Sequence, residues 1–395
     1  MKDIVILDGA RTPFGTFMGS LRKISATDLG VVAAKEALRR SKVDPAQIDA
    51  VVFGNVLQTS PDAIYLARHI GLKAGCPIET PALTLNRLCG SGLEAIVQGA
   101  RLVTLGEARF VLAGGAENMS MAPHQIYGAR EGFALGQGEL VDYLWVALVD
   151  SYNNLGMALT TENLVEKYQI SREEADRFSL RSQQLAAAAQ DAGRLAEEIV
   201  PVEVPGKKGE VTLFQHDEHI RRDVTLEKLA KLPPRFKKGG TVTPGNASGI
   251  NDGAAALVVT SMDTAREMNL EPLGRLVSWG TSGVDPDIMG IGPAPASRQA
   301  LQRAGLRLED IDIIEINEAF AGQYLAVERE LGLDQEKVNV NGGAVAIGHP
   351  LAATGARLTL TALYELRRRG ARYGLVSMCI GGGQGIAAIV ENLQR

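Results

Sequence analysis

Two segments, 48–53 (IDAVVF) and 311–316 (IDIIEI), decide the fold of this chain, because each reads as a buried strand and the two stand 263 positions apart. The same displacement relates two further pairs of segments, 37–40 (ALRR) to 300–303 (ALQR) and 109–112 (RFVL) to 372–375 (RYGL). Short helix-turn-strand phrases also match by coincidence. One constant offset across three separated segments nevertheless favours two copies of one α/β unit.

Strand-like and helix-like segments alternate within the first copy. Apolar runs at 4–7, 50–53 and 110–113 are typical of buried strands, and 26–40 carries apolar residues at helical spacing. This alternation predicts a mostly parallel sheet that is covered by helices.

The stretch between the two copies, about 120–248, has a different character. It contains few buried-strand runs, and it is too long to be a simple connection. Its basic part, which includes Arg221-Arg222 and Lys237-Lys238, is either a solvated face or part of an inserted lobe that covers an anionic ligand.

The overall composition excludes several classes of protein. The 395 residues are 45% hydrophobic and 22% charged, which is close to the average of soluble globular proteins. A formal net charge of −5 argues against nucleic-acid binding and against a polybasic membrane anchor. Three cysteines, the absence of a long apolar run and the absence of a visible signal peptide predict a soluble, cytoplasmic protein that does not contact membranes. No Cys-x-x-Cys or His-Glu-x-x-His spacing occurs, so we expect no metal site.

Cys89 is the first candidate for chemistry. It stands in 86–92 (NRLCGSG), directly before a predicted helix, where the positive end of the helix dipole favours a thiolate. The glycines beside it allow a substrate to approach the backbone and allow peptide N–H groups to face an oxyanion. The alternative is a buried structural cysteine, which is the interpretation we favour for Cys76.

Three more candidates lie in the second half of the chain. His349 follows a glycine-rich loop, and histidine is the usual base that activates a thiol near neutral pH. Cys379 stands in 379–385 (CIGGGQG) after a buried strand, at the sheet edge where open α/β sheets bind ligands. A dinucleotide site is the competing reading of this glycine turn, but no G-x-G-x-x-G follows an N-terminal strand. Asn317, in 317–320 (NEAF), also follows a strand, and taken alone it reads as a turn or cap residue.

Taken together, these four motifs resemble the thiolase family of acetyl-CoA acyltransferases. The match extends over nearly the whole chain and includes 11–15 (RTPFG), 114–120 (GGAENMS) and 246–253 (NASGINDG). Within the family the chain looks most like the mitochondrial-type 3-ketoacyl-CoA thiolases, on 54–58 (GNVLQ) and 62–69 (DAIYLARH).

The resemblance implies an α/β protein with the thiolase fold. Two similar βαβ-type halves, each with a mixed five-stranded sheet, would form α/β/α/β/α layers. A loop domain would be inserted between the main body of the first half and its last strand. The expected boundaries are 1–119 plus 249–270 for the N-terminal half, 120–248 for the inserted loop domain and 271–395 for the C-terminal half.

The resemblance also implies roles for the four motifs. Cys89 would be the nucleophile that is acylated, His349 would take its proton, and Cys379 would move a proton on or off the α-carbon of the acetyl group. The backbone N–H groups of Cys89 and Gly381 would form one oxyanion site. His349 and a water held by Asn317 would form the other.

By the same resemblance, coenzyme A (CoA) would be a substrate bound by the inserted domain, and no cofactor would be bound permanently. The implied CoA contacts are Arg221, Leu232, Phe236, Ser248, Met157 and Phe320. Strictly short-chain members often carry His-Met-Gly where this chain has Gly156-Met157-Ala158, and this departure favours broader acyl-chain tolerance. The expected partners are small acyl-CoA molecules, without nucleic acid or membrane, and the expected assembly is a homodimer or homotetramer.

The function implied is the reversible thiolytic cleavage of 3-ketoacyl-CoA, with acetoacetyl-CoA thiolase activity and a place in fatty acid β-oxidation. Two alternatives share the fold. A decarboxylating or hydroxymethylglutaryl-CoA-synthase-like condensing enzyme would use a single cysteine, so Cys379 argues against it. A non-catalytic lipid-binding protein would be expected to have lost Cys89, His349 or Cys379, and all three are present.

Overall fold

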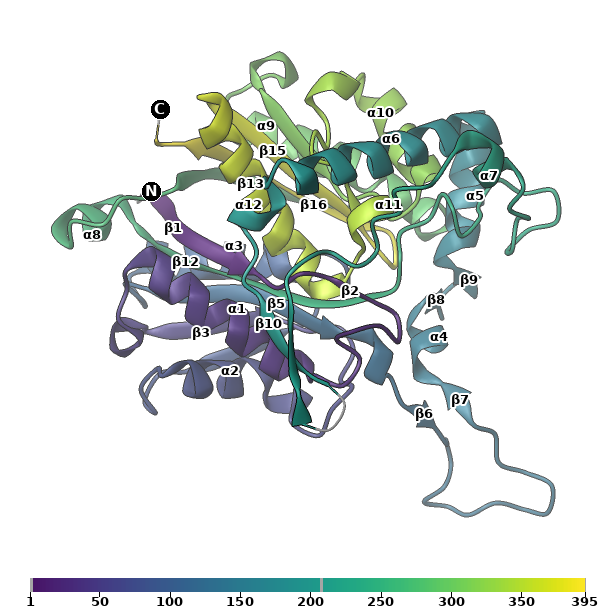
Figure 1. The fold of residues 1–395 in the computed structure, drawn as a ribbon, viewed down its shortest axis with the longest axis horizontal. Helices are drawn as coiled ribbons and strands as arrows, with labels where there is room; N and C mark the ends of the chain where they lie inside the picture. Colours follow the sequence, from purple (N-terminus) through teal and green to yellow (C-terminus); the bar gives the residue numbers. More distant parts are fainter. Residues whose placement is uncertain (1–2, 207–208, 395) are drawn as a thin grey trace.

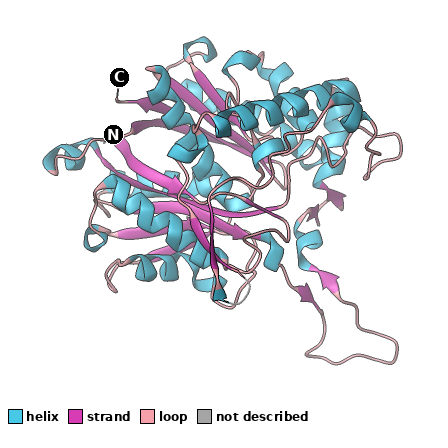
Figure 2. Ribbon diagram, viewed as in Figure 1, coloured by secondary structure: helices cyan, strands magenta, loops and turns pink. Residues whose placement is uncertain are grey.

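Two helices, α3 (Ser91–Leu105) and α12 (Leu351–Arg369), pack against each other at the centre of the molecule, between the sheets of the two halves (Figure 1). The computed structural model describes residues 3–206 and 209–394. Figure 2 shows further helices on the outer faces of the strands, so the molecule has alternating layers of helix and sheet. This arrangement confirms the predicted α/β class with two similar halves.

The N-terminal half contributes five strands to the main sheet. Strand β3 pairs in parallel with both β4 and β5, and β12 pairs antiparallel with β5 and β1. The bounds are β1 (Ile4–Arg11), β3 (Ala50–Gly54), β4 (Ala82–Leu85), β5 (Val111–Asn118) and β12 (Asn251–Ser261), with the short β2 (Gly15–Thr16) pairing with β12 and with the covering helices α1 (Ala26–Ser41) and α2 (Leu66–Ala74).

The C-terminal half repeats this plan. Strand β14 runs parallel to β15, and β16 is antiparallel to both β15 and β13. An isolated bridge between Ile314 and Val338 stands where β4 would be in the first half. The bounds are α8 (Met262–Glu267), β13 (Gly274–Gly283), α9 (Pro293–Ala304), β14 (Ile313–Ile316), α10 (Ala321–Leu331), α11 (Ala344–Ile347), β15 (Tyr373–Ile380) and β16 (Gln384–Asn392).

The two sheets are joined by hydrogen bonds. Strand β1 pairs antiparallel with β13, with Ile4 opposite Leu276, so nine of the described strands follow one order, β14-β15-β16-β13-β1-β12-β5-β3-β4. The chain returns from the inserted segment through β12 into the middle of this order, which is how residues 251–261 become part of the first half.

The repeat read from the sequence is matched by its hydrogen bonds. Asp49 Oδ2 accepts from the consecutive backbone N–H groups of 109–110 at 2.7 and 2.9 Å, and Asp312 Oδ2 accepts from those of 372–373 at 2.8 and 3.0 Å. An aspartate at the equivalent position of each half therefore makes the same contact. Asp49 ties the start of β3 to the residues before β5, and Asp312 ties the start of β14 to the beginning of β15.

The central helices touch through a pair of glycines at equivalent positions of the repeat. A Cβ atom on Gly92 would lie 2.4 Å from the Ala352 carbonyl oxygen, and one on Gly355 would lie 2.4 Å from the Leu93 nitrogen. Because any side chain would push the backbones apart, these two glycines set the distance between α3 and α12. Cys89 and His349 lie just before these two helices, so the same contact sets how closely they approach.

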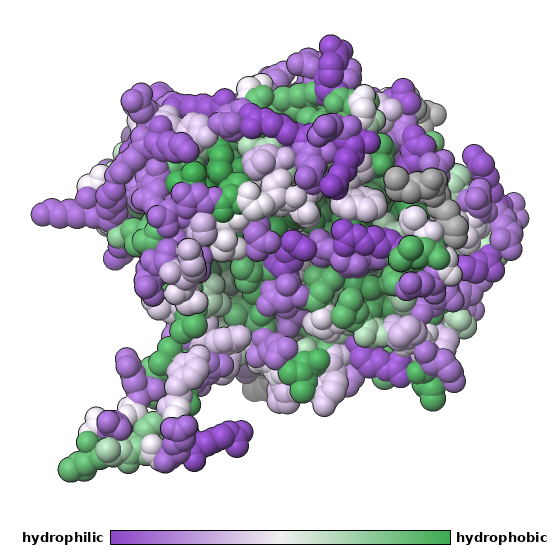
Figure 3. Space-filling model, turned by 180° about the vertical axis from the view of Figure 1, so that it is seen from behind, coloured by the Kyte–Doolittle hydropathy of each residue, from purple (hydrophilic) through white to green (hydrophobic). Residues whose placement is uncertain are grey.

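The segment between β5 and β12 wraps around one side of this body. It includes a thin arm from β6 to β7 that stands clear of the molecule (Figure 1; Figure 3 shows it from the opposite side). The bounds are β6 (His124–Gln125), β7 (Val141–Asp142), α4 (Tyr143–Ala147), β8 (Val149–Asp150), β9 (Leu155–Gly156), α5 (Met157–Lys167), α6 (Arg172–Asp191), β10 (Val202–Pro205), β11 (Val211–Phe214) and α7 (Leu226–Ala230).

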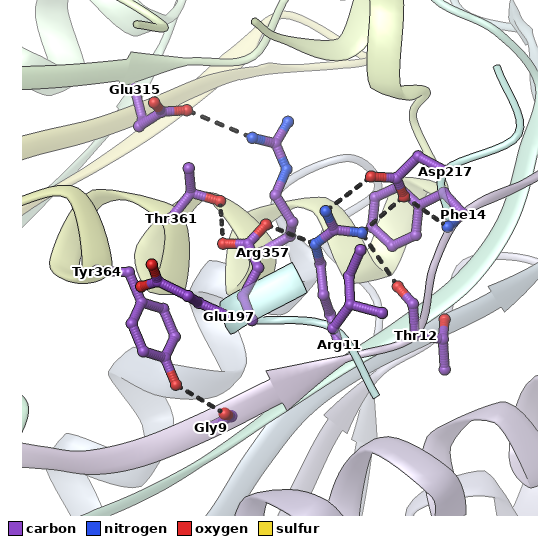
Figure 4. A network of polar contacts seen from close by, with 12 residues as sticks. Gly9, Arg11, Thr12, Phe14, Glu197, Asp217, Glu315, Arg357, Thr361 and Tyr364 are labelled. Atoms are coloured by element: carbon purple, nitrogen blue, oxygen red, sulfur yellow. Dashed lines mark hydrogen bonds and ion pairs between the residues drawn. The ribbon is translucent and has the colours of Figure 1, made fainter. Parts of the chain in front are cut away.

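Arg11 anchors this segment to the first strand (Figure 4). Its guanidinium is fully buried and reaches Glu198 Oε1 at 2.6 Å and the two carboxylate oxygens of Asp217 at 2.7 and 2.8 Å. Burial lowers the pKa of Arg11, but the two carboxylates outweigh it and raise the pKa above its ordinary value.

Of the described helices, none is long and apolar enough to cross a membrane.

Candidate active site

Cys89 occupies a tight turn immediately before α3. Asn86 Oδ1 accepts from the backbone N–H of Leu88 at 2.8 Å, and Ser91 Oγ donates to the Leu88 carbonyl at 2.7 Å. Leu88 itself adopts a positive φ of 46°, which is unusual for a leucine. Such a strained residue beside a reactive side chain is typical of a site whose surroundings hold the backbone in place.

The thiol of Cys89 is protonated at rest. Burial raises the pKa of the Cys89 thiol to about 11, and the backbone N–H groups of Gly381 and of Cys89 itself oppose this rise. The carboxylate of Glu117 adds to the rise. The sulfur therefore lies close to the Gly381 N–H but needs a base before it can act as a nucleophile.

Gly381 follows β15 and faces the Cys89 turn. A Cβ atom on it would lie 3.2 Å from Leu88 Cδ1 and 3.4 Å from Met157 Sδ. Because position 381 is a glycine, its N–H group stays accessible beside the Cys89 sulfur. A side chain at this position would be crowded by its neighbours.

Cys379 is fully buried at the end of β15, two residues before Gly381. Burial raises the pKa of the Cys379 thiol, and the neighbouring Cys89 raises it further. The two sulfurs therefore share one pocket. Cys379 packs with Met289 and Ala319, and Met157 and Phe320 pack against that group.

His349 precedes α12 and is almost completely buried. Its backbone N–H donates to Asn251 Oδ1 at 3.1 Å, and its Nδ1 lies 2.6 Å from Thr354 Oγ1. Burial lowers the pKa of His349 to about 3, with a smaller contribution from Arg357. The imidazole is therefore neutral at rest.

Asn317 follows β14 and points its amide at the histidine. Its Nδ2 lies 3.3 Å from His349 Nε2, and its backbone N–H donates to the Ser377 carbonyl at 3.0 Å. Over residues 3–206 and 209–394, no hydrogen-bond donor reaches the buried Oδ1 of Asn317. That oxygen is free to hold a water.

The loop before His349 is held by a second buried acid, Glu318. Its carboxylate accepts from Ser182 Oγ at 2.7 Å, from Asn339 Nδ2 at 2.8 Å and from the Val345 N–H at 3.0 Å. Burial raises the pKa of Glu318, and these donors counteract the rise. Glu318 was quoted within the sequence motif 317–320, but its role as a support depends on α6 and could not be read there.

Glu117 was not expected at the site. It is the penultimate residue of β5, and its carboxylate accepts from the backbone N–H groups of Val56, Leu57 and Ala352 at 3.0–3.2 Å. Burial raises the pKa of Glu117 to about 7, against the effect of these N–H groups. It ties a loop of the first half to the start of α12 in the second. The signal in the sequence was a charged residue inside an otherwise apolar strand.

An apolar cavity of about 600 Å³ leads to this centre. Three of the expected CoA contacts, Met157, Phe236 and Phe320, line it. The cavity is in the size range of small-molecule sites. Met157 and Phe320 also pack against Cys379, which connects the cavity to the reactive centre.

The other three expected CoA contacts are not among the described residues that line this cavity. The backbone N–H of Ser248 donates to the Ala319 carbonyl at 3.0 Å, beside the bridge between Ala247 and Phe320. Leu232 follows α7, and Arg221 is exposed, with its backbone N–H donating to Gln183 Oε1 at 2.7 Å. In the part of the chain that the structure describes, no group of three or more His, Cys, Asp or Glu could hold a metal ion.

Comparison with known proteins gives a consistent family. Residues 4–263 match the family described as "Thiolase, N-terminal domain", and residues 270–392 match "Thiolase, C-terminal domain". The human mitochondrial 3-ketoacyl-CoA thiolase is 54% identical over 393 residues, covering 99% of each chain. The acetyl-CoA acetyltransferase of Cupriavidus necator is 50% identical over 392 residues, covering 99% of this chain and all of the other.

The fold agrees with a solved structure of the same group. The crystal structure of the human mitochondrial enzyme in complex with CoA superposes with a TM-score of 0.96 at 54% identity, covering 99% of this chain and 98% of the other. This confirms the thiolase fold expected from the sequence. The expectation of a cytoplasmic protein is wrong on this comparison, because the relatives from human, Pongo abelii and Bos taurus are all named mitochondrial.

Proposed function

The chain belongs to the thiolase family, and on that premise we propose a role for each residue of the site. It is an acyltransferase that cleaves 3-ketoacyl-CoA with CoA and catalyses the reverse condensation. The assignments below rest on the geometry around Cys89, His349 and Cys379.

In the first step His349 Nε2 takes the proton of Cys89, and the sulfur attacks the 3-keto carbonyl carbon of the substrate. The raised pKa of the thiol and the lowered pKa of the imidazole both favour the neutral pair at rest. The proton therefore moves as the sulfur–carbon bond forms, when negative charge passes to the substrate oxygen.

In the second step the bond between C2 and C3 breaks. The acyl part stays on Cys89 as a thioester, and the electron pair of the broken bond leaves as the enolate of acetyl-CoA. Cys379 donates its proton to C2 of that enolate. Its thiolate then takes the proton of a second CoA, whose sulfur attacks the acyl-Cys89 carbonyl and releases acyl-CoA. Cys89 leaves as a thiolate and takes back the proton that His349 accepted in the first step.

Two sets of donors stabilise the oxygens that carry charge in these steps. The N–H groups of Cys89 and Gly381 form one set, supported by their common approach to the Cys89 sulfur. The other set is the protonated Nε2 of His349 with a water on Asn317, supported by the free Asn317 Oδ1. Fixed donors of this kind usually give the largest single contribution to the rate.

We assign CoA binding to the inserted segment 120–248, between an N-terminal half of 1–119 plus 249–270 and a C-terminal half of 271–395. The aromatic ring of Phe236 would stack near the adenine end, together with Leu232 and the cation of Arg221. Met157, Phe320 and Ser248 would hold the pantetheine arm. Arg235 and Phe236, which come from the inserted segment, both line the cavity, and this supports the assignment.

We propose that the chain forms a homodimer or homotetramer. Strand β4 ends the strand order, so one edge of its backbone has no strand partner among the described residues. Its Leu83 is 52% exposed, and the arm between β6 and β7 exposes Ile126, Phe133 and Leu135. An exposed apolar edge of this kind is normally covered by another chain.

The observation that carries the proposal is the half-buried thiol of Cys89, which interacts with the second thiol, Cys379, and stands at the start of α3, while the neutral imidazole of His349 stands at the start of the adjoining α12. Intact-mass analysis after mixing with acetyl-CoA should show one added acetyl group, which peptide mapping places on Cys89. Cys89→Ala should show none, and Cys379→Ser should still be acetylated but should condense poorly. A wild-type chain without an adduct would refute the acyl-enzyme mechanism.

A further inference from the structure

The cavity has more apolar wall than the proposed CoA contacts occupy. Phe17, in the loop after β2, lines it from one side. Leu144 and Trp145, on α4, line it as well. None of these three residues is among the proposed CoA contacts. The side chains of Phe17 and Leu144 have no polar atom, and Trp145 has only its indole N–H, so most of this wall is suited to contact a hydrocarbon.

The part of the cavity wall that Phe17, Leu144 and Trp145 form extends towards the nucleophile, Cys89. Leu144 belongs to a buried apolar group against which Cys89 and Ile250 pack. Met157 and Phe320 instead pack against Cys379. An acyl group carried on Cys89 therefore borders the Leu144 side of the cavity, and the part that leaves with CoA borders the Cys379 side.

We propose, resting on the acyl-enzyme mechanism above, that Phe17, Leu144 and Trp145 form the subsite for the aliphatic tail of 3-ketoacyl substrates longer than four carbons. The tail is saturated and uncharged. Asp142 also lines the cavity, and its carboxylate accepts from the Leu144 N–H at 2.9 Å.

The loop that presents Phe17 is rigidly held, although the ring itself is 47% exposed. The carboxylate of Glu218 accepts from the N–H groups of Thr16 and Ser20 at 2.9 and 3.1 Å, and from their hydroxyls at 3.0 and 2.6 Å. The Met18 N–H donates to Ser120 Oγ at 2.8 Å. The backbone that carries the ring is thus held in place before substrate binds, which reduces the entropy lost on binding.

A tail on this wall gains affinity with length. Each buried methylene strengthens binding about fourfold. Selectivity for a longer chain should therefore depend on Phe17, whereas the four-carbon substrate is too short to reach it.

The test compares kcat/KM for thiolysis of acetoacetyl-CoA and 3-ketooctanoyl-CoA in the full-length protein. Phe17→Ala should lower the value for the eight-carbon substrate about tenfold and leave the four-carbon value within twofold. Phe236→Ala is the matched control, because Phe236 is an aromatic residue of the same cavity with a similar exposure of 42%. It should lower both values equally, because both substrates carry CoA.

A second variant tests the support of the loop. Glu218→Gln removes the charge that holds Thr16 and Ser20, so it should reduce the eight-carbon value selectively, by less than Phe17→Ala. Equal losses for both substrates in Phe17→Ala, or no loss for either, would overturn the subsite. A wild-type protein inactive on acetoacetyl-CoA would instead overturn the mechanism on which the subsite rests, so the two failures are distinguishable.

Discussion

The Nδ1 atom of His349 lies 2.6 Å from Thr354 Oγ1, and the Thr354 hydroxyl lies 3.0 Å from the Pro350 carbonyl oxygen, to which it donates. Because the single hydroxyl proton of Thr354 is used on Pro350, the threonine oxygen must accept from Nδ1–H of the histidine. This leaves a lone pair on Nε2, the atom that Asn317 approaches. Thr354 is a positioning residue that sets the tautomer in which His349 can take a proton.

Thr354→Val should lower kcat about 10- to 100-fold, because valine has the same shape and cannot accept from Nδ1. Thr354→Ser keeps the hydroxyl and should retain most of the activity. The measurement is the rate of Cys89 acetylation followed by mass, together with kcat. Thermal melting of both variants controls for packing. A fully active Thr354→Val protein would contradict the role given to the tautomer.

Gly381→Ala should lower kcat about 100-fold, because the new Cβ crowds Leu88 and Met157 and moves an N–H group out of the oxyanion site. Gly283→Ala is the control, since the atom nearest to its Cβ would be 4.0 Å away. Both variants should melt close to the wild type. If Gly381→Ala acetylates and condenses at the wild-type rate, the Gly381 N–H does not carry charge in the reaction.

Acid should destabilise the protein through His349. Its pKa is lowered to about 3 in the folded chain, from 6.5, so between these values the unfolded chain binds the additional proton. Stability therefore falls as the pH drops from 6.5 towards 3, by up to about 1.4 kcal/mol per pH unit. Urea unfolding at pH 7, 5.5 and 4.5 should show a shallower loss for His349→Asn.

Arg11→Met should destabilise the fold by about 3–5 kcal/mol, because it leaves Glu198 and Asp217 buried without their cation. Arg11→Lys restores the charge without the two parallel hydrogen bonds and should lie between the wild type and Arg11→Met. Urea denaturation measures the difference. Arg222→Met breaks an exposed pair with Asp191 and should change nothing measurable.

Much of the fold followed from the 263-residue repeat, and the structure gives the reason. The repeated units conserve their hydrogen bonds as well as their apolar pattern, as Asp49 and Asp312 show. The start of a helix just after Cys89 and the loop before His349 could also be predicted from the sequence, because glycines and polar residues interrupt apolar segments there.

The supports of the site were less visible, because they depend on contacts between distant segments. Glu117 acts through Ala352, which is 235 positions away, and Glu218 acts through a loop about 200 positions before it. Thr354 lies close to His349 in sequence, but a threonine in a helix gives no local indication that its hydroxyl faces an imidazole. The joining of the sheets through β1 and β13 was equally hidden, since either strand would also suit an edge.

The pairing of β1 with β13, which joins the two sheets, affects how the chain folds while it is being synthesised. Of the described strands, β1 pairs only with β12 and β13, which begin about 250 residues later. At the usual ~5–20 residues per second, a ribosome synthesises that intervening stretch in roughly 10–50 s. Strand β1 is therefore synthesised long before its two neighbours, and throughout that interval its apolar residues are unpaired. The nascent chain should accordingly depend on a holding chaperone far more than the finished protein does.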